Sequence, residues 1–283
     1  MAVPYEKLMS LEVKNESIRY TDRETILYAL SVGMGRNPLD ANELPYVYEG
    51  AGLKTVPSLA TVLMRIPILV SGLDMVKLLH GEQRLTMHHP IPAEGDLLCD
   101  SRVSGVYDKG PGKGAIVLME ANVRTAAEGK PLFTATTIFF ARGDGGTGGP
   151  GGAAPRPHAI PERAPDATSI VETRPDQALL YRLNIDRNPL HADPAVAKRA
   201  GFDAPILHGL CAYGNVCRAL LKSVCDYDYR RIEGLDVRFS APIYPGESIE
   251  VDTWRDGNVV SFRCRVPSRN LVVMDNGKCT LKS

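Results

Sequence analysis

The sequence of 283 residues predicts an α+β fold of two similar halves, each a long central helix wrapped by an antiparallel sheet. Three observations lead to this prediction. A glycine- and proline-rich stretch divides the chain into halves of comparable length. Short motifs recur in the same order in both halves, and each half passes from helix-like to strand-like segments.

The dividing stretch is GDGGTGGPGGAAPRPHAIPERAP, at residues 143–165. It has no apolar periodicity, and its composition is typical of a flexible linker. We therefore expect three parts: an N-terminal repeat at residues 1–142, the linker, and a C-terminal repeat at residues 166–283.

The two halves share two motifs. YALSVGMGRNPLD (residues 28–40) and YRLNIDRNPLH (residues 181–191) both carry Arg-Asn-Pro-Leu after a Tyr-x-Leu. RLTMHHPIPAEGDLL (residues 84–98) and DVRFSAPIYPGESIE (residues 236–250) both place Pro-Ile ahead of a glycine and an acid. The shared order indicates duplication followed by divergence.

In the first half, the Asp-Arg-Glu at residues 22–24 predicts a helix start before TILYALSVG. The apolar stretch at about residues 57–79 predicts the long helix of this half. Three runs then alternate apolar and polar residues and meet at glycine and aspartate turns, as strands do. These runs are GDLLCDSRVSGVYD, GAIVLMEANVRT and PLFTATTIFFAR.

The second half repeats this plan. The Pro-Asp-Gln at residues 175–177 predicts a helix start before ALLYRL, and residues 208–224 predict the long helix. Four strand-like runs follow, which are LDVRFSAPIY, SIEVDTWRD, VVSFRCRVP and NLVVMDNGKCTL.

Composition and charge exclude several classes of protein. Lys plus Arg equals Asp plus Glu at 33 each, which argues against a protein that binds nucleic acid. The six cysteines have neither C-x-x-C nor zinc-ligand spacing, so we expect reduced core thiols and no metal.

Charged residues interrupt the most apolar stretch, residues 55–80, so we expect no membrane span. The start resembles no signal peptide and the ending is not Ser-Lys-Leu, so we expect a cytoplasmic protein. No G-x-G-x-x-G follows a strand and no Walker A motif is present, so we expect no redox or nucleotide cofactor.

The segment at residues 181–191 places Asp186 five residues before His191. The two side chains either form a proton-transfer pair or merely hydrogen-bond the loop together. Further on, the next helix is expected to start at His208-Gly209. Gly209 is there either for close packing or to offer its N–H to an oxyanion, helped by the helix dipole. An acid, an imidazole and such a donor suit the addition of water to a conjugated thioester.

The stretch YRLNIDRNPLHADPAVAKRAGFDAPILHGLCAYG resembles the signature of the type 2, (R)-specific, MaoC-like enoyl-CoA hydratases. The resemblance implies a double hot dog, in which two repeats of a helix wrapped by a sheet merge their sheets into one. It implies interconversion of trans-2-enoyl-CoA and (R)-3-hydroxyacyl-CoA, with CoA entering only as part of the acyl-CoA substrate and no other cofactor. Hot-dog sheets pair through their edges, so a homodimer is one assembly that this fold allows.

The resemblance also implies roles for single residues. Asp186 and His191 are expected to hold and activate water, with Asn188 binding the water or the substrate. Gly209 is expected to donate its N–H to the thioester oxygen. Further contacts to the acyl-CoA are implied at His80, Gly81, Lys109 and Phe239, and supporting positions at Tyr181 and Glu49. From the residues alone, Lys109 is equally well a solvated turn lysine, and His80 and Phe239 suit a core.

The first half lacks the catalytic pair. Its Arg-Asn-Pro-Leu motif ends in Asp40 rather than histidine, and Met34-Gly35 stand where the acid is expected. We therefore expect chemistry only in the C-terminal half, with the first half free to accommodate the acyl chain. Three other histidines are expected to be non-catalytic, and they are His88, His89 and His158.

One departure from the family pattern precedes the acid, where Asn184-Ile185 replace the usual Ser-Gly. Isoleucine disfavours a positive φ, so the backbone here must be ordinary or the loop displaced. The Ile185 side chain is expected either to desolvate the acid or to narrow the pocket. Two other functions stay open: a non-catalytic acyl-CoA-binding protein, and a hot-dog acyl-CoA thioesterase.

Overall fold

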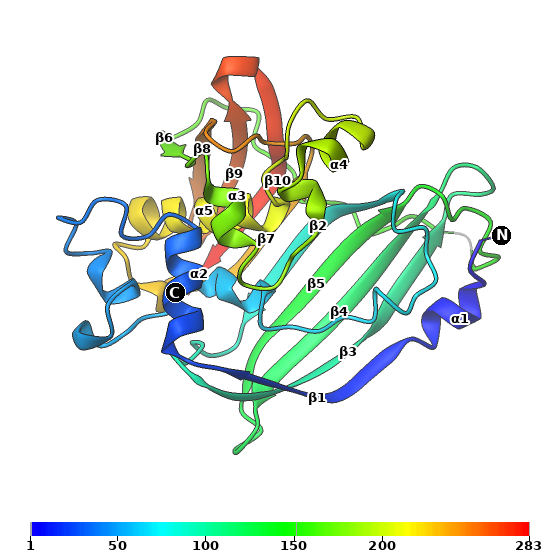
Figure 1. The fold of residues 1–283 in the computed structure, drawn as a ribbon, viewed down its shortest axis with the longest axis horizontal. Helices are drawn as coiled ribbons and strands as arrows, with labels where there is room; N and C mark the ends of the chain where they lie inside the picture. Colours follow the sequence, from blue (N-terminus) through cyan, green and yellow to red (C-terminus); the bar gives the residue numbers. More distant parts are fainter. Residues whose placement is uncertain (1, 151, 283) are drawn as a thin grey trace.

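A single antiparallel sheet of ten strands runs through both halves of the computed structural model, which describes residues 2–150 and 152–282. Its order is β1-β3-β4-β5-β2-β7-β10-β9-β8-β6 (Figure 1). The strands of the first half are β1 (Glu12–Tyr20), β2 (Leu78–Met87), β3 (Gly95–Asp108), β4 (Ala115–Thr125) and β5 (Pro131–Ala141). Those of the second half are β6 (Ala167–Glu172), β7 (Ile232–Phe239), β8 (Ser248–Asp256), β9 (Val259–Val266) and β10 (Leu271–Leu281).

The two halves merge where β2 pairs with β7, from Glu82 opposite Arg238 to Thr86 opposite Gly234. Each half therefore contributes five consecutive strands to one sheet, and three of these, β1, β2 and β6, were not among the strand-like runs of the sequence. Met1, Gly151 and Ser283, which belong to the three predicted parts of the chain, lie outside the described residues.

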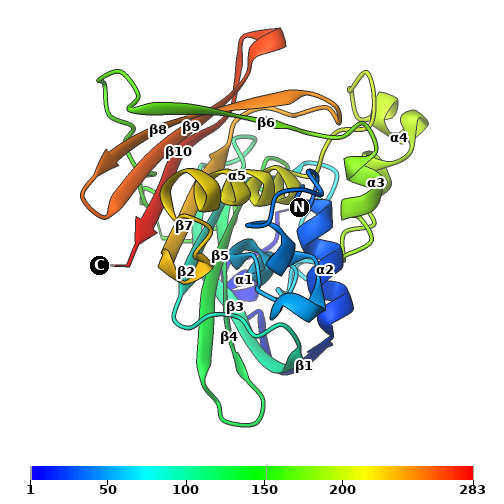
Figure 2. The ribbon, with the colours of Figure 1, turned by 90° about the vertical axis from the view of Figure 1, so that its left-hand side faces the viewer.

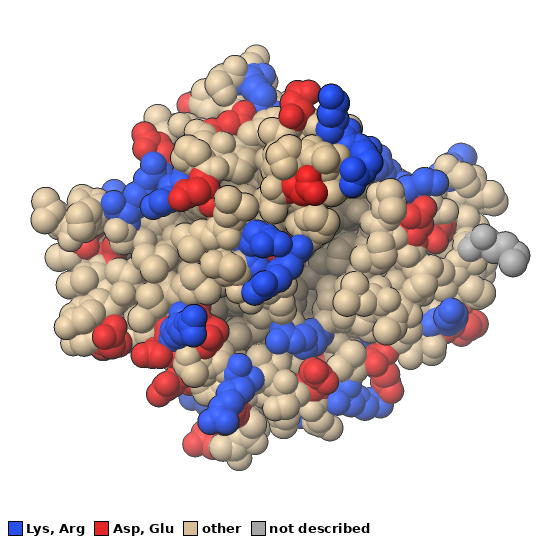
Figure 3. Space-filling model, in the orientation of Figure 1, with Lys and Arg blue, Asp and Glu red and all other residues tan. Residues whose placement is uncertain are grey.

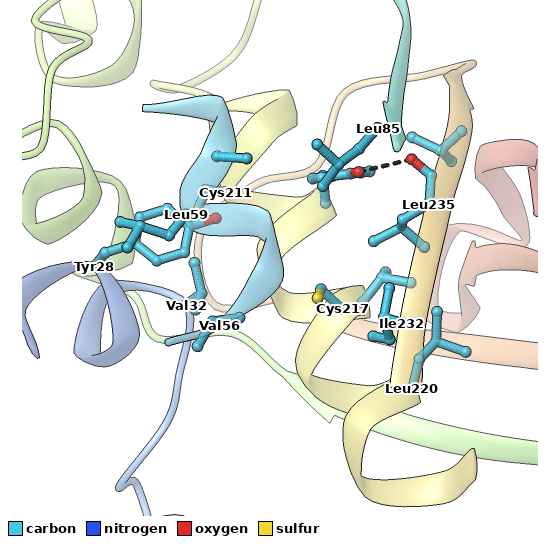
Figure 4. Packing of buried hydrophobic residues seen from close by; sticks show 14 of the residues in the cluster. Tyr28, Val32, Val56, Leu59, Leu85, Cys211, Cys217, Leu220, Ile232 and Leu235 are labelled. Atoms are coloured by element: carbon cyan, nitrogen blue, oxygen red, sulfur yellow. Dashed lines mark hydrogen bonds between the residues drawn. The ribbon is translucent and has the colours of Figure 1, made fainter. Parts of the chain in front are cut away.

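The long helix α5 (Gly209–Val224) lies against the concave face of the sheet, which curves around it (Figure 2). Cys217 and Leu220 of α5 face Ile232 and Leu235 of β7, and all four side chains are fully buried (Figure 4). The hydroxyl of the buried Tyr213 donates to the carbonyl oxygen of Leu235 at 2.7 Å. Burying an apolar helix face against a sheet removes it from water, so α5 is the centre of the core.

The prediction of a long helix at residues 57–79 is wrong. Only the 3₁₀ turn η3 (Pro57–Thr61) forms there, and the chain then runs without helix to β2. Pro67 lacks an N–H and restricts Ile66 before it, while Gly72 adopts φ +78°, and these features end any helix. The central helix is therefore present only in the second half, and η3 packs against α5 in place of a second one.

The remaining helices are short. They are α1 (Tyr5–Met9), α2 (Asp22–Ser31), α3 (Gln177–Tyr181) and α4 (Pro194–Arg199), with the 3₁₀ turns η1 (Leu44–Tyr46), η2 (Glu49–Ala51), η4 (Pro189–His191), η5 (Tyr229–Arg231) and η6 (Pro267–Arg269). The predicted start of α2 is confirmed, and Thr21 and Glu24 form a capping box there, with Thr21 N donating to Glu24 Oε2 at 2.8 Å. No helix of the described residues is both long and apolar enough to cross a bilayer.

The described part of the linker forms no helix or strand, but it is not a free tether. The His158 ring nitrogen Nε2 lies 2.8 Å from Ser261 Oγ on β9, and Asn276 on β10 donates to the His158 carbonyl oxygen at 2.7 Å. The indole N–H of Trp254 donates to the carbonyl oxygen of Arg163 at 2.7 Å. The linker is therefore fastened to the outer face of the second half of the sheet. All six cysteines are buried and unpaired, as expected for core thiols.

Candidate active site

The loop that follows α3 is tied to the first half of the chain by Asn184. Its Nδ2 donates to the carbonyl oxygen of Tyr181 at 2.8 Å and to Ser31 Oγ of α2 at 3.0 Å. Ile185 is not among the described residues with positive φ, so the backbone here is ordinary and needs no glycine. The Ile185 side chain is 45% exposed and Asp186 beside it is also exposed. Ile185 therefore neither covers the acid nor fills a pocket, and Asn184 has a structural use.

Asp186 and Asn188 build the turn that leads into η4. Asn188 N donates to Asp186 Oδ1 at 3.0 Å, and Leu190 N donates to Asn188 Oδ1 at 3.0 Å. The second carboxylate oxygen of Asp186 has no partner among residues 2–150 and 152–282. One oxygen of Asp186 thus fixes the loop, and the other is left for a ligand.

His191 ends η4 and is buried, with 8% of its surface exposed. Its Nδ1 lies 2.8 Å from the carbonyl oxygen of Ile206. Because a carbonyl only accepts, Nδ1 must carry the proton and Nε2 is the free basic nitrogen. Burial lowers the pKa of His191, which favours the neutral form that a general base requires.

A second histidine, His208, completes the cluster. Its ring stacks on His191 with centroids 3.7 Å apart and an interplanar angle of 24°. His208 Nε2 donates to the backbone carbonyl oxygen of Asp186 at 3.1 Å, while its Nδ1 is buried without a partner in the described chain. A carboxylate oxygen of Asp186 and one nitrogen of each histidine all lie within 4.8 Å of one another. In the sequence, His208 stands out only as the start of a helix. Its stacking on His191 depends on how the loop after α3 approaches α5, and no local pattern shows that.

The cluster has the residue types of a metal site but not its geometry. Three converging lone pairs are needed to hold one ion. The two nearly parallel rings direct their nitrogens side by side, and each ring already has one nitrogen bonded to a backbone carbonyl. The arrangement suits proton transfer better than metal binding, and the expected absence of a metal stays a prediction.

His80, Gly81, Phe239 and Gly209 meet beside this cluster. The His80 ring lies 4.9 Å from that of Phe239, centroid to centroid, and a Cβ added to Gly209 would come within 3.3 Å of the Phe239 ring. Gly81 lies at a bulge in β2, where a Cβ would come within 3.3 Å of the Ile138 carbonyl oxygen. Burial lowers the pKa of His80 to about 4, and the negative charge of Asp186 acts in the opposite direction. Two strands and the start of α5 thus converge on the acid.

The first N–H of α5 belongs to Gly209 and has no acceptor among the described residues. A helix of 16 residues adds a partial positive charge at that end. Figure 3 shows basic side chains gathered beside a hollow near the centre of the face that carries the loop after α3, a loop that includes Arg182 and Arg187. The surroundings of the site therefore favour an anionic ligand.

Tyr181 lies behind His208, with ring centroids 4.9 Å apart, and Tyr28 of α2 lies behind Tyr181 at 6.1 Å. Both tyrosines are buried and both hydroxyls lack a partner among the described residues. Tyr181 thus lies between His208 and Tyr28 and extends the row of rings to the first half, while its supporting role stays a prediction.

Two of the expected residues lie apart from the cluster. Lys109 is exposed in the turn after β3, with Nζ 5.2 Å from the centroid of the Phe140 ring. Glu49 is exposed on η2 and makes no hydrogen bond to Asp186 or the stacked histidines, so the structure does not place it in a supporting position. The buried acid of that region is Glu43, which accepts from Arg218 at 2.7 Å.

The counterpart loop of the first half is structural. Glu43 also accepts from Gly35 N at 2.8 Å, and Asp40 accepts from the Tyr227 hydroxyl at 3.1 Å. The first bond closes the loop on itself, and the second joins it to the segment that follows α5. His88 and His89 are bonded to Thr134 and Pro131 at the far end of β5, away from the cluster.

Two histidines beside the site, the buried His208 and the half-buried His80, make the fold sensitive to acid. Burial lowers the pKa of His80 to about 4, and burial together with His191 lowers that of His208 to about 4, against an ordinary 6.5. The unfolded chain then binds more protons than the folded one between these values. The contribution of the two neutral rings to the free energy of unfolding is fully present above pH 6.5, and it is lost as the pH falls towards 4.

We therefore expect the free energy of unfolding to fall between pH 6.5 and 4, with His80 contributing up to about 3 kcal/mol of the loss. The measurement is denaturant unfolding of the wild type and His80→Gln across this range. The stability gap between them should narrow as the pH falls, whereas exposed His88→Gln should follow the wild type. A gap that does not change with pH would contradict the assignment.

Comparisons with known proteins show the family to which the chain belongs. Residues 18–143 match the MFE-2 hydratase 2 N-terminal domain, and residues 157–275 match the MaoC like domain. A probable enoyl-CoA hydratase 2 of Dictyostelium discoideum is 37% identical, over 98% of this chain and 96% of that protein. The peroxisomal multifunctional enzyme type 2 of Mus musculus is 36% identical over 92% of this chain, which spans only 36% of that longer protein.

Solved structures support the fold. A MaoC-like dehydratase from Phytophthora capsici superposes with a TM-score of 0.86 at 30% identity, covering 99% of this chain and 98% of the other. A protein of Mycobacterium tuberculosis described as a double hotdog fold superposes with a TM-score of 0.53 at 14% identity, covering 96% of this chain and 95% of the other. The predicted double hot dog is confirmed.

Proposed function

Because the chain belongs to the MaoC-like hydratase 2 family and is a hydro-lyase enzyme, we propose that it is an (R)-specific hydratase interconverting trans-2-enoyl-CoA and (R)-3-hydroxyacyl-CoA. The observation that carries this proposal is the cluster of Asp186 with the stacked His191 and His208, beside the free N–H of Gly209. It offers a base, an acid and an oxyanion donor within one small volume.

In the hydration direction, water lies between the free oxygen of Asp186 and Nε2 of His191. The pair takes one proton as the water oxygen bonds to the β-carbon, and it returns a proton to the α-carbon. Negative charge that develops on the thioester oxygen is held by Gly209 N–H and the start of α5. General acid–base groups contribute roughly 10²–10⁴ in rate and one oxyanion donor roughly 10²–10³.

The stacked His208 is a positioning residue in this scheme. Its Nε2–H holds the Asp186 backbone at 3.1 Å and its ring supports the face of His191. The thioester would pass His80, Gly81 and Phe239 on its way to Gly209. Lys109, in an exposed turn, would meet the phosphates of CoA, since a cation near phosphate is favourable.

The acyl chain would enter the first half, where no long helix fills the concave face. The segment that replaces it exposes several large apolar side chains, namely Leu69, Val70, Met75 and Val76. Such side chains would gain from contact with an alkyl chain, since each buried methylene contributes about 0.8 kcal/mol.

We expect kcat/KM to be at least about tenfold higher for a ten-carbon than for a four-carbon enoyl-CoA, because several methylenes are buried on binding. Initial rates on trans-2-decenoyl-CoA and crotonyl-CoA measure this. Strict preference for the four-carbon substrate would contradict the placement of the acyl chain, though not the chemistry.

The function itself is tested by mixing the protein with crotonyl-CoA and following the absorbance of the conjugated thioester together with release of free thiol. Loss of the absorbance without thiol is the expected result. Release of thiol would identify a thioesterase, and tight binding without turnover a binding protein.

Compartment and assembly remain predictions. A cytoplasmic location is expected from the sequence, whereas the mouse relative is named as peroxisomal. Acyl-CoA is the proposed partner, and a homodimer through sheet edges is proposed from the fold.

A further inference from the structure

A polar cavity of about 200 Å³ lies on the outer face of the sheet, at the seam between the two halves. Strands β2, β7 and β10 form its floor, and linker residues 156–158 form its cover. Side chains alternate along a strand, so Leu85 and Leu235 point to the core while Arg84 and Asp236 point outward. The cavity is thus on the opposite face of the sheet from Asp186 and α5.

Positive charge exceeds negative charge in this cavity. Four cationic side chains line it against two carboxylates; they are Arg84, Arg156, Arg238 and Lys278 against Glu82 and Asp236. Glu82 is already bonded to Arg84 at 2.9 Å. Asp236 stands opposite Arg84 and Lys278 in the sheet. No ion pair of Arg156, Arg238 or Lys278 is found within the described ranges, so an excess of two positive charges faces the cavity.

The cover over the cavity is held in place. His158 bonds through Nε2 to Ser261 Oγ at 2.8 Å and accepts from Asn276 through its carbonyl oxygen at 2.7 Å. Arg156 lies two residues before this anchor and lines the cavity. Burial and the nearby Lys278 lower the pKa of His158, which keeps its ring neutral at pH 7. The excess charge therefore comes from the arginines and the lysine alone.

We propose that this seam cavity binds a phosphate group as its dianion. An excess of two positive charges matches the charge of a phosphate dianion, and arginine guanidinium groups bind phosphate oxygens in pairs. The group can belong to inorganic phosphate or to a phosphate ester such as the nucleotide end of CoA. Since the cavity and Asp186 lie on opposite faces, this binding does not depend on the hydration chemistry.

The test is calorimetric titration of the full chain with inorganic phosphate at constant ionic strength, with chloride as the balancing anion. Saturable binding to one site is expected for the wild type. Arg156→Gln and Arg238→Gln should each weaken it at least about tenfold, the effect of losing one charge-assisted contact. Arg102→Gln is the matched control, because Arg102 is exposed on β3 and does not line the cavity, and it should leave phosphate binding unchanged. Melting temperatures of Arg156→Gln and Arg238→Gln equal to that of the wild type would show that both variants are folded.

A second titration with adenosine 3′,5′-bisphosphate separates the two sources. Binding of this nucleotide at least about tenfold tighter than inorganic phosphate, and lost in the same variants, would support the proposal with an ester as the source. If inorganic phosphate saturates the site and the nucleotide does not bind, the proposal would be supported with inorganic phosphate as the ligand. Wild-type protein that binds neither probe, or variants that bind as the wild type does, would overturn it.

Discussion

Replacing Asp186 by asparagine is expected to lower kcat for crotonyl-CoA hydration by about 10²–10⁴-fold. The substitution removes the negative charge that accepts the water proton. It keeps an oxygen that accepts from Asn188 N, as Asp186 Oδ1 does at 3.0 Å, so the turn should persist. KM and the melting temperature should therefore change little, and initial rates and thermal unfolding measure both.

Asp203→Asn is the matched control, because Asp203 is exposed outside the cluster. It should keep full activity. Full activity in Asp186→Asn would show that this carboxylate is not the acid of the reaction, and a large loss of stability would show a structural role instead.

His191→Gln is expected to lower kcat by about 10²-fold or more, because glutamine supplies no basic nitrogen in place of Nε2. Its amide can still donate to the Ile206 carbonyl oxygen, which accepts from His191 at 2.8 Å, so the buried hydrogen bond should be retained. The loss should not add to that of Asp186→Asn in the double variant, since the two groups move the same proton. Steady-state kinetics of both single variants and the double variant provide this measurement.

His88→Gln serves as the control for histidine loss, since His88 is exposed and bonded only to Thr134. Additive losses in the double variant would mean that Asp186 and His191 act in separate steps. A kcat of His191→Gln equal to that of the wild type would show that the His191 imidazole takes no part in proton transfer.

Seven of the ten strands were predictable because their alternation is strong and they end at turns, whereas β1, β2 and β6 were not among the strand-like runs of the sequence. The absence of an Asp–His pair from the first half was visible in its Arg-Asn-Pro-Leu motif, which ends in Asp40. The helix at residues 57–79 was wrongly predicted, because an apolar run without a clear period fits a buried loop as well as a helix. Pro67 was the available signal against it. The pairing of β2 with β7 joins residues far apart in the sequence, and no local pattern encodes it.

The site was only partly predictable for the same reason. The Asp–His spacing made Asp186 and His191 candidates and the family resemblance implied their roles, but the stacking of His208 on His191 depends on two loops meeting in space. Glu49 is exposed on η2, whereas the buried acid of that region is Glu43, which no motif of the sequence singled out. Asn184-Ile185 departs from the family's usual Ser-Gly beside the acid. In the structure Asn184 holds the loop in place by donating hydrogen bonds to the Tyr181 carbonyl oxygen and to Ser31 Oγ.

The face that carries Asp186, His191 and Gly209 is expected to add water to an enoyl-CoA with one handedness. The most direct measurement is the configuration of the 3-hydroxyacyl-CoA that the wild-type protein forms from trans-2-enoyl-CoA, determined by chiral separation of the product. We predict the (R) product, with none formed by Asp186→Asn. An (S) product, or an (R) product formed equally by the variant, would contradict the claim.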